Sequence, residues 1–198
     1  MKEPLYRPAV LEDAPALAEL VNFAGEGLPV YLWEKSKEPG ETVWDVGRRR
    51  ACREEGAFSY RNATVAEVGG KVAALLVGYA LPDAPEPIGP DMPGMFRPLQ
   101  ELENLAPATW YVNVLATYPE HRGKGLGAKL LTVAEDKTRE AGLRGLSIIV
   151  SDGNPGARRL YQRSGYREQA SRPMIKDAWS NPGVNWVLLT KTLPAPKS

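Results

Sequence analysis

Cysteine and histidine are nearly absent from this sequence, since Cys52 and His121 are the only ones among 198 residues. A lone cysteine can form neither an internal disulfide nor a thiolate metal site by itself, so a reducing compartment is allowed. We expect Cys52 to pack as a small apolar residue. A lone histidine leaves a histidine-centred triad or metal cluster with a single member. The sequence therefore predicts no metal centre. His121 stands at the entrance of a glycine-rich segment, which suggests a loop or ligand-proximal role rather than a catalytic one.

Long apolar runs and an excess of charge of one sign are also missing. The longest mainly apolar run, Val72–Leu81, has about half of the ~20 residues that a membrane-spanning helix needs. Met1–Pro4 lacks the apolar core of a secretion signal. Lys plus Arg number 25 and Asp plus Glu 24, and this near-balance argues against a wide phosphate-binding face. We therefore expect a cytoplasmic protein with neither a membrane nor a nucleic-acid partner.

The length suits one domain, and we expect a single domain over residues 1–198. Segment 82–108 is expected to be a Pro-rich insertion or lid, because Pro82–Pro107 holds seven prolines in 26 residues. The run 48–55 holds four arginines and two glutamates, and it is expected to form a solvated face rather than a substrate contact.

Hydrophobic periodicity predicts strands that alternate with helices. Gly69-Gly70 between two apolar runs indicates a hairpin, Asp13 is expected to cap the first helix, and Thr42-x-x-Asp45 suits a capping box. Glycine and proline in 22–39 predict a mixed, irregular stretch. The predicted strands are Leu5–Val10, Ala63–Val68, Lys71–Leu81, Trp110–Thr117, Leu146–Val150, one from Tyr166 onward, and Trp186–Leu193. The predicted helices follow Asp13 and Thr42, cover Leu99–Leu105, and run from Leu126 to Gly142 and from Pro155 to Gly165.

The order strand, helix, strand, helix over residues 110–165 implies a right-handed parallel crossover. An antiparallel hairpin precedes it and two strands follow it. The sequence therefore predicts an α/β (α+β) fold with a mixed, mostly antiparallel central sheet, one parallel pair of strands, and helices on both faces.

Glycine is densest in Arg122-Gly123-Lys124-Gly125-Leu126-Gly127-Ala128, between a predicted strand and a predicted helix. Glycine at three alternate positions lets a backbone come close to a ligand. The helix that begins there directs its free N–H groups and its positive dipole end to the same spot. This combination predicts a phosphate or pyrophosphate site, to which Arg122 and Lys124 add charge.

Two other phosphate-binding motifs fit this loop less well. A P-loop requires Ser or Thr after its lysine, but Lys129 follows Ala128 and precedes Leu130. The dinucleotide motif G-x-G-x-x-[GA] is met by Gly123, Gly125 and Ala128. Residues 118–122 separate it from the strand, however, and the acidic residue expected about 20 positions on is missing. A dinucleotide-binding protein remains the less favoured alternative.

Residues 110–166 resemble the GNAT superfamily of N-acetyltransferases over two motifs. Arg122, Gly125 and Gly127 meet the core of the strand-to-helix signature, [QR]-x-x-G-x-[GA]. The second signature, N-x-x-A-x-x-[LF]-Y-x-x-x-G-[FY], is similar to Asn154-x-x-Ala157-x-x-Leu160-Tyr161-x-x-x-Gly165-Tyr166. Both motifs stand in the family's order, each on the expected strand and helix, and the flanking elements also fit the family's layout.

The resemblance implies acetyl-CoA as cosubstrate, no metal, and acetyl transfer to a primary amine. In the family the pyrophosphate binds the amides of the glycine loop, and the pantothenate arm pairs with the central strand where it splays from its parallel neighbour at the cofactor cleft. Tyr161 matches the tyrosine that protonates the departing thiolate, although it also suits a core position. Asn154 also suits a plain helix cap. The cofactor-binding residues carried over are Leu115, Ala116, Thr117, Arg122, Gly123, Lys124, Gly125, Leu126, Gly127, Ala128, Asn154 and Arg158.

One feature departs from the family's pattern. Many relatives carry a glutamate on the central strand that relays a proton from the amine, but Val112–Thr117 holds no carboxylate. An amine with a pKa near ~10 must lose a proton before it attacks. The general base is left open among Glu26, Glu101, Glu103, Asp152, and a water held by Tyr111 and Asn113.

The sequence thus predicts an acetyl-CoA-dependent N-acetyltransferase that works by direct attack of a primary amine, with Tyr161 as general acid. The acceptor is expected to be a small molecule, in a site shaped by the amino-terminal elements and segment 82–108. Within enzymes, another acyl-CoA or a hydroxyl acceptor is the rival hypothesis. A non-catalytic acyl-CoA sensor is the rival from another class. A homodimer that pairs the closing strands, Trp186–Leu193 among them, is a further alternative.

Overall fold

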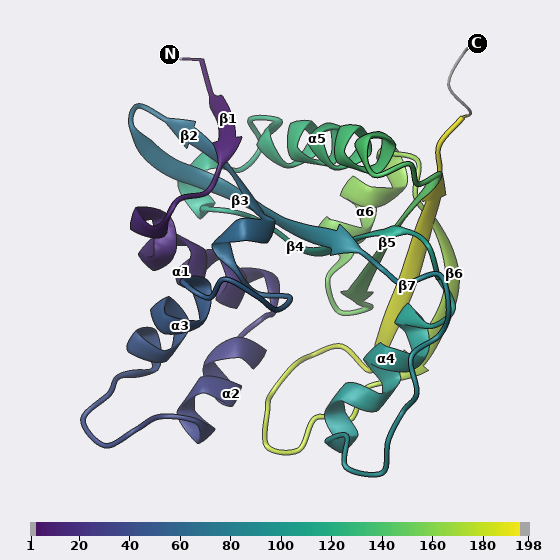
Figure 1. The fold of residues 1–198 in the computed structure, drawn as a ribbon, viewed down its shortest axis with the longest axis horizontal. Coiled ribbons are helices and arrows are strands. Elements are labelled where there is room, and N and C mark those ends of the chain that lie inside the picture. Colours follow the sequence, from purple (N-terminus) through teal and green to yellow (C-terminus); the bar gives the residue numbers. More distant parts are fainter. Residues whose placement is uncertain (1–2, 195–198) are drawn as a thin grey trace. The chain divides into compact units, whose positions relative to one another are not determined.

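The computed structural model describes residues 3–194 as strands and helices with short connections (Figure 1). The ends of the predicted domain, residues 1–2 and 195–198, lie outside the described residues. The strands are β1 (Leu5–Pro8), β2 (Ala63–Val68), β3 (Lys71–Ala80), β4 (Trp110–Thr117), β5 (Gly145–Ser151), β6 (Arg167–Pro173) and β7 (Asn185–Thr192). The α-helices are α1 (Ala14–Ala24), α2 (Leu28–Lys35), α3 (Val43–Ala51), α4 (Arg97–Glu103), α5 (Leu126–Glu140) and α6 (Pro155–Arg163).

The strands form one seven-stranded sheet in the order β1-β2-β3-β4-β5-β7-β6. The pairs β1/β2, β2/β3, β5/β7 and β6/β7 are antiparallel, whereas β4 and β5 are parallel. The predicted mixed, mostly antiparallel sheet with a parallel pair is therefore confirmed. The predicted Gly69-Gly70 hairpin is also confirmed, with Val68 opposite Lys71.

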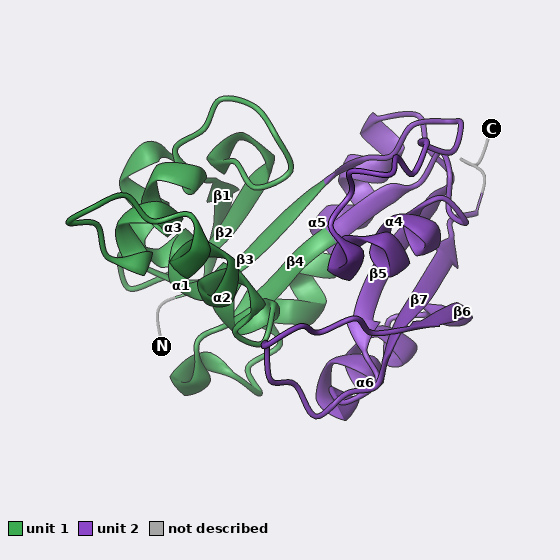
Figure 2. Cartoon of the chain, turned by 90° about the horizontal axis from the view of Figure 1, so that it is seen from below, with its two compact units in different colours: residues 1–78, 113–131 green, residues 79–112, 132–198 purple. Residues whose placement is uncertain are grey.

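The chain divides into two compact units, which Figure 2 shows in different colours. Unit 1 (green) comprises residues 1–78 and 113–131, and unit 2 (purple) comprises residues 79–112 and 132–198. β3, β4 and α5 each contribute residues to both units.

The core of unit 1 is formed by α1, α2 and α3 against β2, β3 and the end of β4. Leu17 of α1 and Leu75 of β3 are completely buried in it. α3 comes especially close to its neighbours at Gly47, where a Cβ would lie 2.6 Å from the Trp33 ring and 3.0 Å from the Ala18 Cβ. Glycine is required there because the space is already filled.

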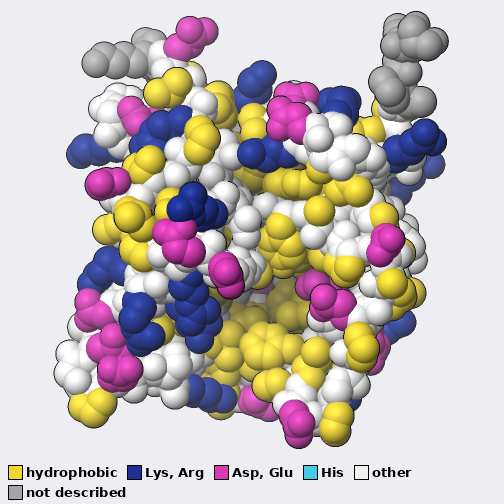
Figure 3. Space-filling view, in the orientation of Figure 1, with side chains coloured by type: hydrophobic (Ala, Val, Ile, Leu, Met, Phe, Trp, Pro, Cys, Tyr) yellow, Lys and Arg dark blue, Asp and Glu magenta, His cyan; other side chains and the backbone are white. Residues whose placement is uncertain are grey.

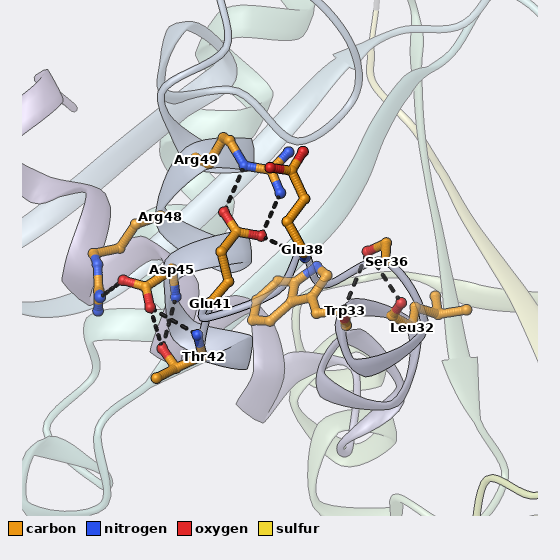
Figure 4. Close-up of polar contacts among 9 residues, drawn as sticks. All are labelled: Leu32, Trp33, Ser36, Glu38, Glu41, Thr42, Asp45, Arg48 and Arg49. Atoms are coloured by element: carbon orange, nitrogen blue, oxygen red, sulfur yellow. Dashed lines mark hydrogen bonds and ion pairs between the residues drawn. The ribbon is translucent and has the colours of Figure 1, made fainter.

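The basic side chains of the run 48–55 belong to a charged surface. Figure 3 shows Lys and Arg side chains gathered over α3 on this face of unit 1. Arg48 forms an ion pair with Asp45, and Arg49 forms one with Glu41 (Figure 4). The solvated face predicted for this run agrees with these exposed pairs.

The predicted capping box at the start of α3 is confirmed (Figure 4). The Thr42 hydroxyl accepts a hydrogen bond from the Asp45 amide, and the Asp45 carboxylate accepts one from the Thr42 amide. Hydrogen bonds from Thr42, followed by that from Arg48, lower the pKa of Asp45 to about 2. The local sequence alone is sufficient to define this helix start.

Three expectations for unit 1 are wrong. Stretch 22–39 contains helix α2, because Gly27 (φ 85°) ends the preceding turn and Pro29 lies in the first helical turn, where no N–H is needed. Asp13 precedes α1 but does not cap it, since its carboxylate accepts from Arg7 and from the Val10 amide. Cys52 is exposed rather than packed, because the chain leaves α3 at that residue.

In unit 2, segment 82–108 is an excursion whose two ends are tied together. The Leu81 amide donates to the Thr109 carbonyl at 2.8 Å, and the Ala108 amide donates to the Pro82 carbonyl at 2.9 Å. The segment contains α4, close to the predicted Leu99–Leu105, which packs against β5, β6 and β7. Leu102 of α4 is completely buried in a cluster with Leu188 of β7. Segment 82–108 is therefore anchored on the sheet by its helix.

Strand β5 is buried on both sides, as its continuous apolar sequence predicts. Ile149 packs in the cluster with α4, while Ile148 and Val150, which point to the opposite face, are also buried. β7 pairs with β5 on one side and with β6 on the other. Trp186–Leu193 therefore offers no free edge for pairing with a second copy, and of the closing strands only β6 lies at an edge.

Gly47→Ala is expected to lower the free energy of unfolding by about 1–3 kcal/mol, because overpacking against Trp33 outweighs the helix propensity of alanine. Gly156→Ala in α6 is the matched control, since its Cβ would meet only the Asn154 Oδ1 at 3.7 Å. That variant should be neutral or slightly stabilising. Urea unfolding measures both, and equal stabilisation of the two would contradict the close packing at Gly47.

Candidate active site

The glycine loop joins β4 to α5 in unit 1. The chain leaves β4 at Thr117, makes a short 3-10 turn over Pro119–His121, and enters α5 at Leu126. Gly123 (φ 73°) and Gly125 (φ 81°) adopt the left-handed conformation that other residues rarely tolerate. A Cβ at either position would have nothing within 4 Å. The glycines are thus required by backbone conformation, and the loop is open on the side where their side chains would stand.

The cationic side chains of the loop bind its own backbone. Arg122 Nε donates to the Thr117 carbonyl at 3.2 Å, and Lys124 Nζ donates to the Glu120 carbonyl at 2.8 Å. The Lys129 amide donates to the Gly125 carbonyl at 3.0 Å as α5 begins. The amides before it belong to the first turn, which has no helical acceptors for them. An anion would therefore find backbone N–H groups, the positive end of α5 and two nearby cations.

His121 lies in the turn immediately before this loop. Its Nδ1 is buried and has no hydrogen-bond partner among the described residues. The predicted loop position is confirmed by the structure.

The end of β4 supplies the other predicted residues of unit 1. The ladder between β4 and β5 consists of three pairs, from Trp110 opposite Leu146 to Val112 opposite Ile148. β4 continues to Thr117, while the rest of β5 pairs with β7. Leu115 and Thr117 are half-buried, and Ala116 between them is buried.

In unit 2, Asp152 organises the turn between β5 and α6. Its carboxylate accepts hydrogen bonds from the Val184 amide at 2.8 Å and from the Asn185 Nδ2 at 2.9 Å. Burial works against the ionised form, but the hydrogen bonds from Asn185 and Val184 and the charge of Arg158 outweigh it, so the pKa is lowered. The Asn154 side chain then accepts from the Ala157 amide at 3.0 Å, which caps α6 as predicted.

Tyr161 lies on the buried face of α6 and is only 4% exposed. Its ring centroid is 6.0 Å from that of Tyr166, whose hydroxyl is buried without a hydrogen-bond partner among the described residues. Burial raises the pKa of Tyr111 well above its ordinary value, and the charges of Glu103, Tyr79 and Tyr161 add to this effect in that order. Tyr111 of β4 therefore stands within electrostatic reach of Tyr161.

Arg158, predicted to contact the cofactor, forms an ion pair with Glu168 at 2.8 Å. Its Nε is buried and has no partner within residues 3–194. The guanidinium is thus held at the start of α6 by one nitrogen and retains donor capacity at another.

The structure separates the four carboxylates that the sequence left open as general base. Glu101 is exposed and paired with Arg172 at 2.8 Å, and Asp152 is committed to its turn. Glu26 belongs to unit 1, at a turn residue with φ 51°. Glu103 is half-buried and borders a cavity.

That cavity lies in unit 2 between the end of β3, the start of segment 82–108 and α4, with a volume of about 360 Å³. Tyr79, Glu86 and Glu103 supply its titratable groups, and Pro82 and Pro85 part of its apolar wall. None of the described residues that line it is Lys, Arg or His. Burial, followed by the charge of Glu86, raises the pKa of Glu103 to about 7. We refer to this space as the glutamate cavity.

Sequence reasoning placed the loop, Asn154 and Tyr161 on the right elements but missed the glutamate cavity. Glu103 was one candidate among several, and Tyr79 and Glu86 were not considered. The prolines of segment 82–108 were the available signal, because they predict a chain that folds back on itself. Nothing local indicates that Glu86 returns to α4, where its amide donates to Asn104 Oδ1 and its carbonyl accepts from Asn104 Nδ2.

Comparison with known proteins defines the class. A model of the acetyltransferase (GNAT) family matches residues 29–166, which is more than half of the chain. The chain belongs to this family, and it is an N-acetyltransferase of the transferase class. The predicted resemblance and enzyme class are confirmed.

One curated relative and two solved structures illustrate the similarity to individual acetyltransferases. An L-methionine sulfoximine/L-methionine sulfone acetyltransferase of Pseudomonas paraeruginosa is 25% identical over 169 residues, which are 85% of this chain and 83% of that protein. The crystal structure of an acetyltransferase has a TM-score of 0.65 and 24% identity, covering 96% of this chain and all of that one. A GNAT family acetyltransferase from Elizabethkingia anophelis, solved with acetyl-CoA bound, has a TM-score of 0.50 and 19% identity, covering 66% and 75% of the two chains. These two structures share the fold.

No group of three or more His, Cys, Asp or Glu side chains within residues 3–194 could hold a metal ion. None of the helices described is both long and apolar enough to cross a membrane.

Glu103→Gln should stabilise the protein increasingly as the pH rises. The folded carboxyl, with a pKa of about 7, keeps a proton that the unfolded chain loses near 4.5. The free energy of unfolding of the wild type therefore decreases as the pH rises from about 4.5 to about 7. The amide of the Glu103→Gln variant does not titrate, so it causes no such decrease. We expect the melting temperature of Glu103→Gln relative to the wild type to increase from about pH 4.5 to about pH 7.5 in thermal unfolding.

The matched contrast is Asp152→Asn, because the pKa of Asp152 is lowered from 3.8. Its charge stabilises the fold above pH 3.8 and this contribution is lost as the pH falls. This variant should melt below the wild type at neutral pH, with a deficit that shrinks in acid. A pH-independent difference for Glu103→Gln would contradict the raised pKa of Glu103.

Proposed function

We propose that the protein transfers the acetyl group of acetyl-CoA to the primary amine of a small molecule by direct attack. The open glycine loop at the start of α5 carries this proposal. Gly123 and Gly125 adopt positive φ values just before α5 begins, and nothing lies within 4 Å of either Cβ position. The N-terminus of a helix such as α5 favours an anion. The family's chemistry is acetyl transfer, and this loop suits a pyrophosphate.

In this proposal the loop amides from Arg122 to Ala128 bind the pyrophosphate, and Leu115–Thr117 offer backbone groups to the pantothenate arm. Asn154 and Arg158, at the start of α6, are further proposed cofactor contacts. The donor capacity of Arg158 suits a nucleotide phosphate, since guanidinium groups bind phosphate oxygens well. When bound, acetyl-CoA supplies the thioester carbon that the amine attacks.

Tyr161 acts as general acid in this mechanism. Its hydroxyl donates a proton to the sulfur as the carbon–sulfur bond breaks, because a thiolate leaves more readily when a donor stands within hydrogen-bond reach. A backbone N–H on β4 stabilises the negative charge on the former carbonyl oxygen.

The acceptor class follows from chemistry and from the relatives. A relative with 25% identity is described as acting on L-methionine sulfoximine and L-methionine sulfone, which are small molecules with a primary amine. L-Methionine sulfone is therefore the first acceptor to assay. We also propose that residues 1–198 work as one catalytic domain, with segment 82–108 as part of its acceptor site.

Acetyl-CoA should stabilise the protein in thermal unfolding, whereas NAD and ATP should not. A ligand at about 100 times its dissociation constant raises the free energy of unfolding by ~2.7 kcal/mol. For a chain of this size, each kcal/mol raises the melting temperature by roughly 2–4 °C. Gly125→Val should abolish the shift, because it fills the open side of the loop and strains a left-handed residue. A shift with NAD alone would refute the acetyltransferase proposal.

Tyr161→Phe should lower kcat by about 10²–10⁴ while leaving the acetyl-CoA shift nearly intact, as expected for loss of a general acid. Tyr166→Phe is the matched control, because it removes a neighbouring buried hydroxyl that has no partner among the described residues. Turnover is measured by thiol release. Equal turnover in the Tyr161→Phe variant and the wild type would rule out this acid.

A further inference from the structure

The glutamate cavity brings polar side chains from separate segments to one space. Glu103 of α4, Glu86 of segment 82–108 and Tyr79 of β3 all line it, and Tyr111 of β4 packs against Tyr79. Tyr111 is 5% exposed, and its ring meets that of Tyr79 edge-on at 5.7 Å. A cavity with a partly apolar wall and a few polar side chains that converge on it is the usual form of a small-molecule site.

The shape of the cavity is maintained by other side chains. Asn104 of α4 exchanges hydrogen bonds of 2.9 and 2.8 Å with the backbone of Glu86, and Gln100 donates to Asn104 at 3.2 Å. These amides are occupied in holding the chain near Glu86 against α4. The Glu86 and Glu103 side chains are consequently brought to one space by a fixed scaffold.

The charge of the cavity selects a cation. Its lining holds two glutamates and no Lys, Arg or His, and the charge of Glu86 makes ionisation of Glu103 less favourable. Arg172 of β6, a strand that packs against α4, is engaged by Glu101. A ligand with a positive charge relieves the repulsion, and tyrosine faces such as that of Tyr79 also attract cations.

The size of the cavity suits a small molecule. A volume of about 360 Å³ lies at the lower end of the usual range for ligand sites. Part of the wall is apolar, with Pro82, Pro85 and Leu81, which favours a short carbon chain beside the charged end. A protonated primary amine on such a chain meets both conditions.

The cavity also lies near the proposed acid. Tyr111 is within electrostatic reach of Glu103, of Tyr79 and of Tyr161. Acetyl transfer to an amine needs a base that deprotonates the acceptor nitrogen and an acid that protonates the leaving sulfur. Glu103 and Tyr161, which both act electrostatically on Tyr111, carry the two required chemical groups.

We infer that the glutamate cavity is the acceptor site, that it takes a cationic alkylamine lacking an adjacent carboxylate, and that Glu103 is the general base that deprotonates it. This inference rests on the proposed acetyl transfer. A carboxylate beside the amine would face Glu86 and Glu103 without a cation to balance it, and like charges placed together in a site cost several kcal/mol.

The protons balance in this scheme. Glu103 takes one proton from the ammonium, and the nitrogen lone pair then forms the carbon–nitrogen bond. The carbon–sulfur bond breaks as Tyr161 protonates the sulfur. The nitrogen then loses a second proton, which passes to the Tyr161 oxygen and restores its hydroxyl. Glu103 releases its proton to water, so the products are the N-acetylamine, free CoA and one proton. The carboxylate suits this role because its pKa of about 7 lets it ionise near neutral pH.

The test compares two acceptors that differ only in a carboxylate, 3-(methylsulfonyl)propylamine and L-methionine sulfone. We expect kcat/KM to be at least about tenfold higher for the former. Its pH profile in the wild type should rise with a limb near pH 7. Glu103→Gln should lower kcat by about 10²–10⁴ and lose this limb.

Two further variants separate catalysis from structure. Glu86→Gln should raise KM for the amine and shift the limb to lower pH, because the charge of Glu86 raises the pKa of Glu103. Glu101→Gln, on the same helix but paired with Arg172, should keep the limb. A purely structural role for Glu103 would not move the pH profile.

Several results would overturn the inference. They are an unchanged limb in Glu103→Gln, loss of the limb in Glu101→Gln instead, a preference for L-methionine sulfone, or absence of both acetylation and calorimetric binding of 3-(methylsulfonyl)propylamine. The acetyl-CoA thermal shift of each variant is measured in parallel. If the wild type shows no such shift, the proposed function fails; if the shift is present and the amine results fail, only the acceptor site is wrong.

Discussion

The short parallel ladder between β4 and β5 is the constraint on which the rest of the site depends. Three residue pairs, from Trp110 to Val112, join β4 to β5 within unit 2, and these pairs include Tyr111. The remainder of β4 belongs to unit 1 and leads directly into the glycine loop and the positive end of α5. One strand therefore carries a buried phenol near its start and leads at its end into the glycine loop, while its pairing with β5 covers only three residues.

The carboxylates of unit 2 lie in surroundings that differ in burial and in neighbouring charges and donors. Asp152 is stabilised in its charged form by backbone and side-chain donors, and it serves to hold a turn. Glu101 is exposed and faces Arg172. Glu103, two residues further along α4, is desolvated and faces another glutamate, so its charged form is disfavoured. A group held in this way reduces stability at neutral pH and is suited to proton transfer, which is typical of functional sites.

Most elements of the fold were predictable because their signals are local. The Thr42–Asp45 capping box, the Gly69-Gly70 hairpin and the Asn154 cap each depend on residues within four positions of one another. The errors arose where a distant partner competes. Asp13 has the right chemistry for a helix cap, but Arg7 of β1 and the Val10 amide take its carboxylate. Helix α2 was missed because Gly27 and Pro29, which usually interrupt helices, here stand at its start.

The sequence by itself determined the class of the fold, the position of the glycine loop and the place of Tyr161 on a helix. Residue spacing within each motif specifies this local backbone geometry directly. Only the tertiary structure decided which carboxylate stands beside Tyr111. Glu103 and Asp152 are both carboxylic acids, but burial raises the pKa of Glu103 whereas hydrogen bonds lower that of Asp152. The neighbours involved, Glu86 for Glu103 and Asn185 for Asp152, are 17 and 33 positions away in the chain. Ionisation depends on distance in space, which local sequence patterns do not encode.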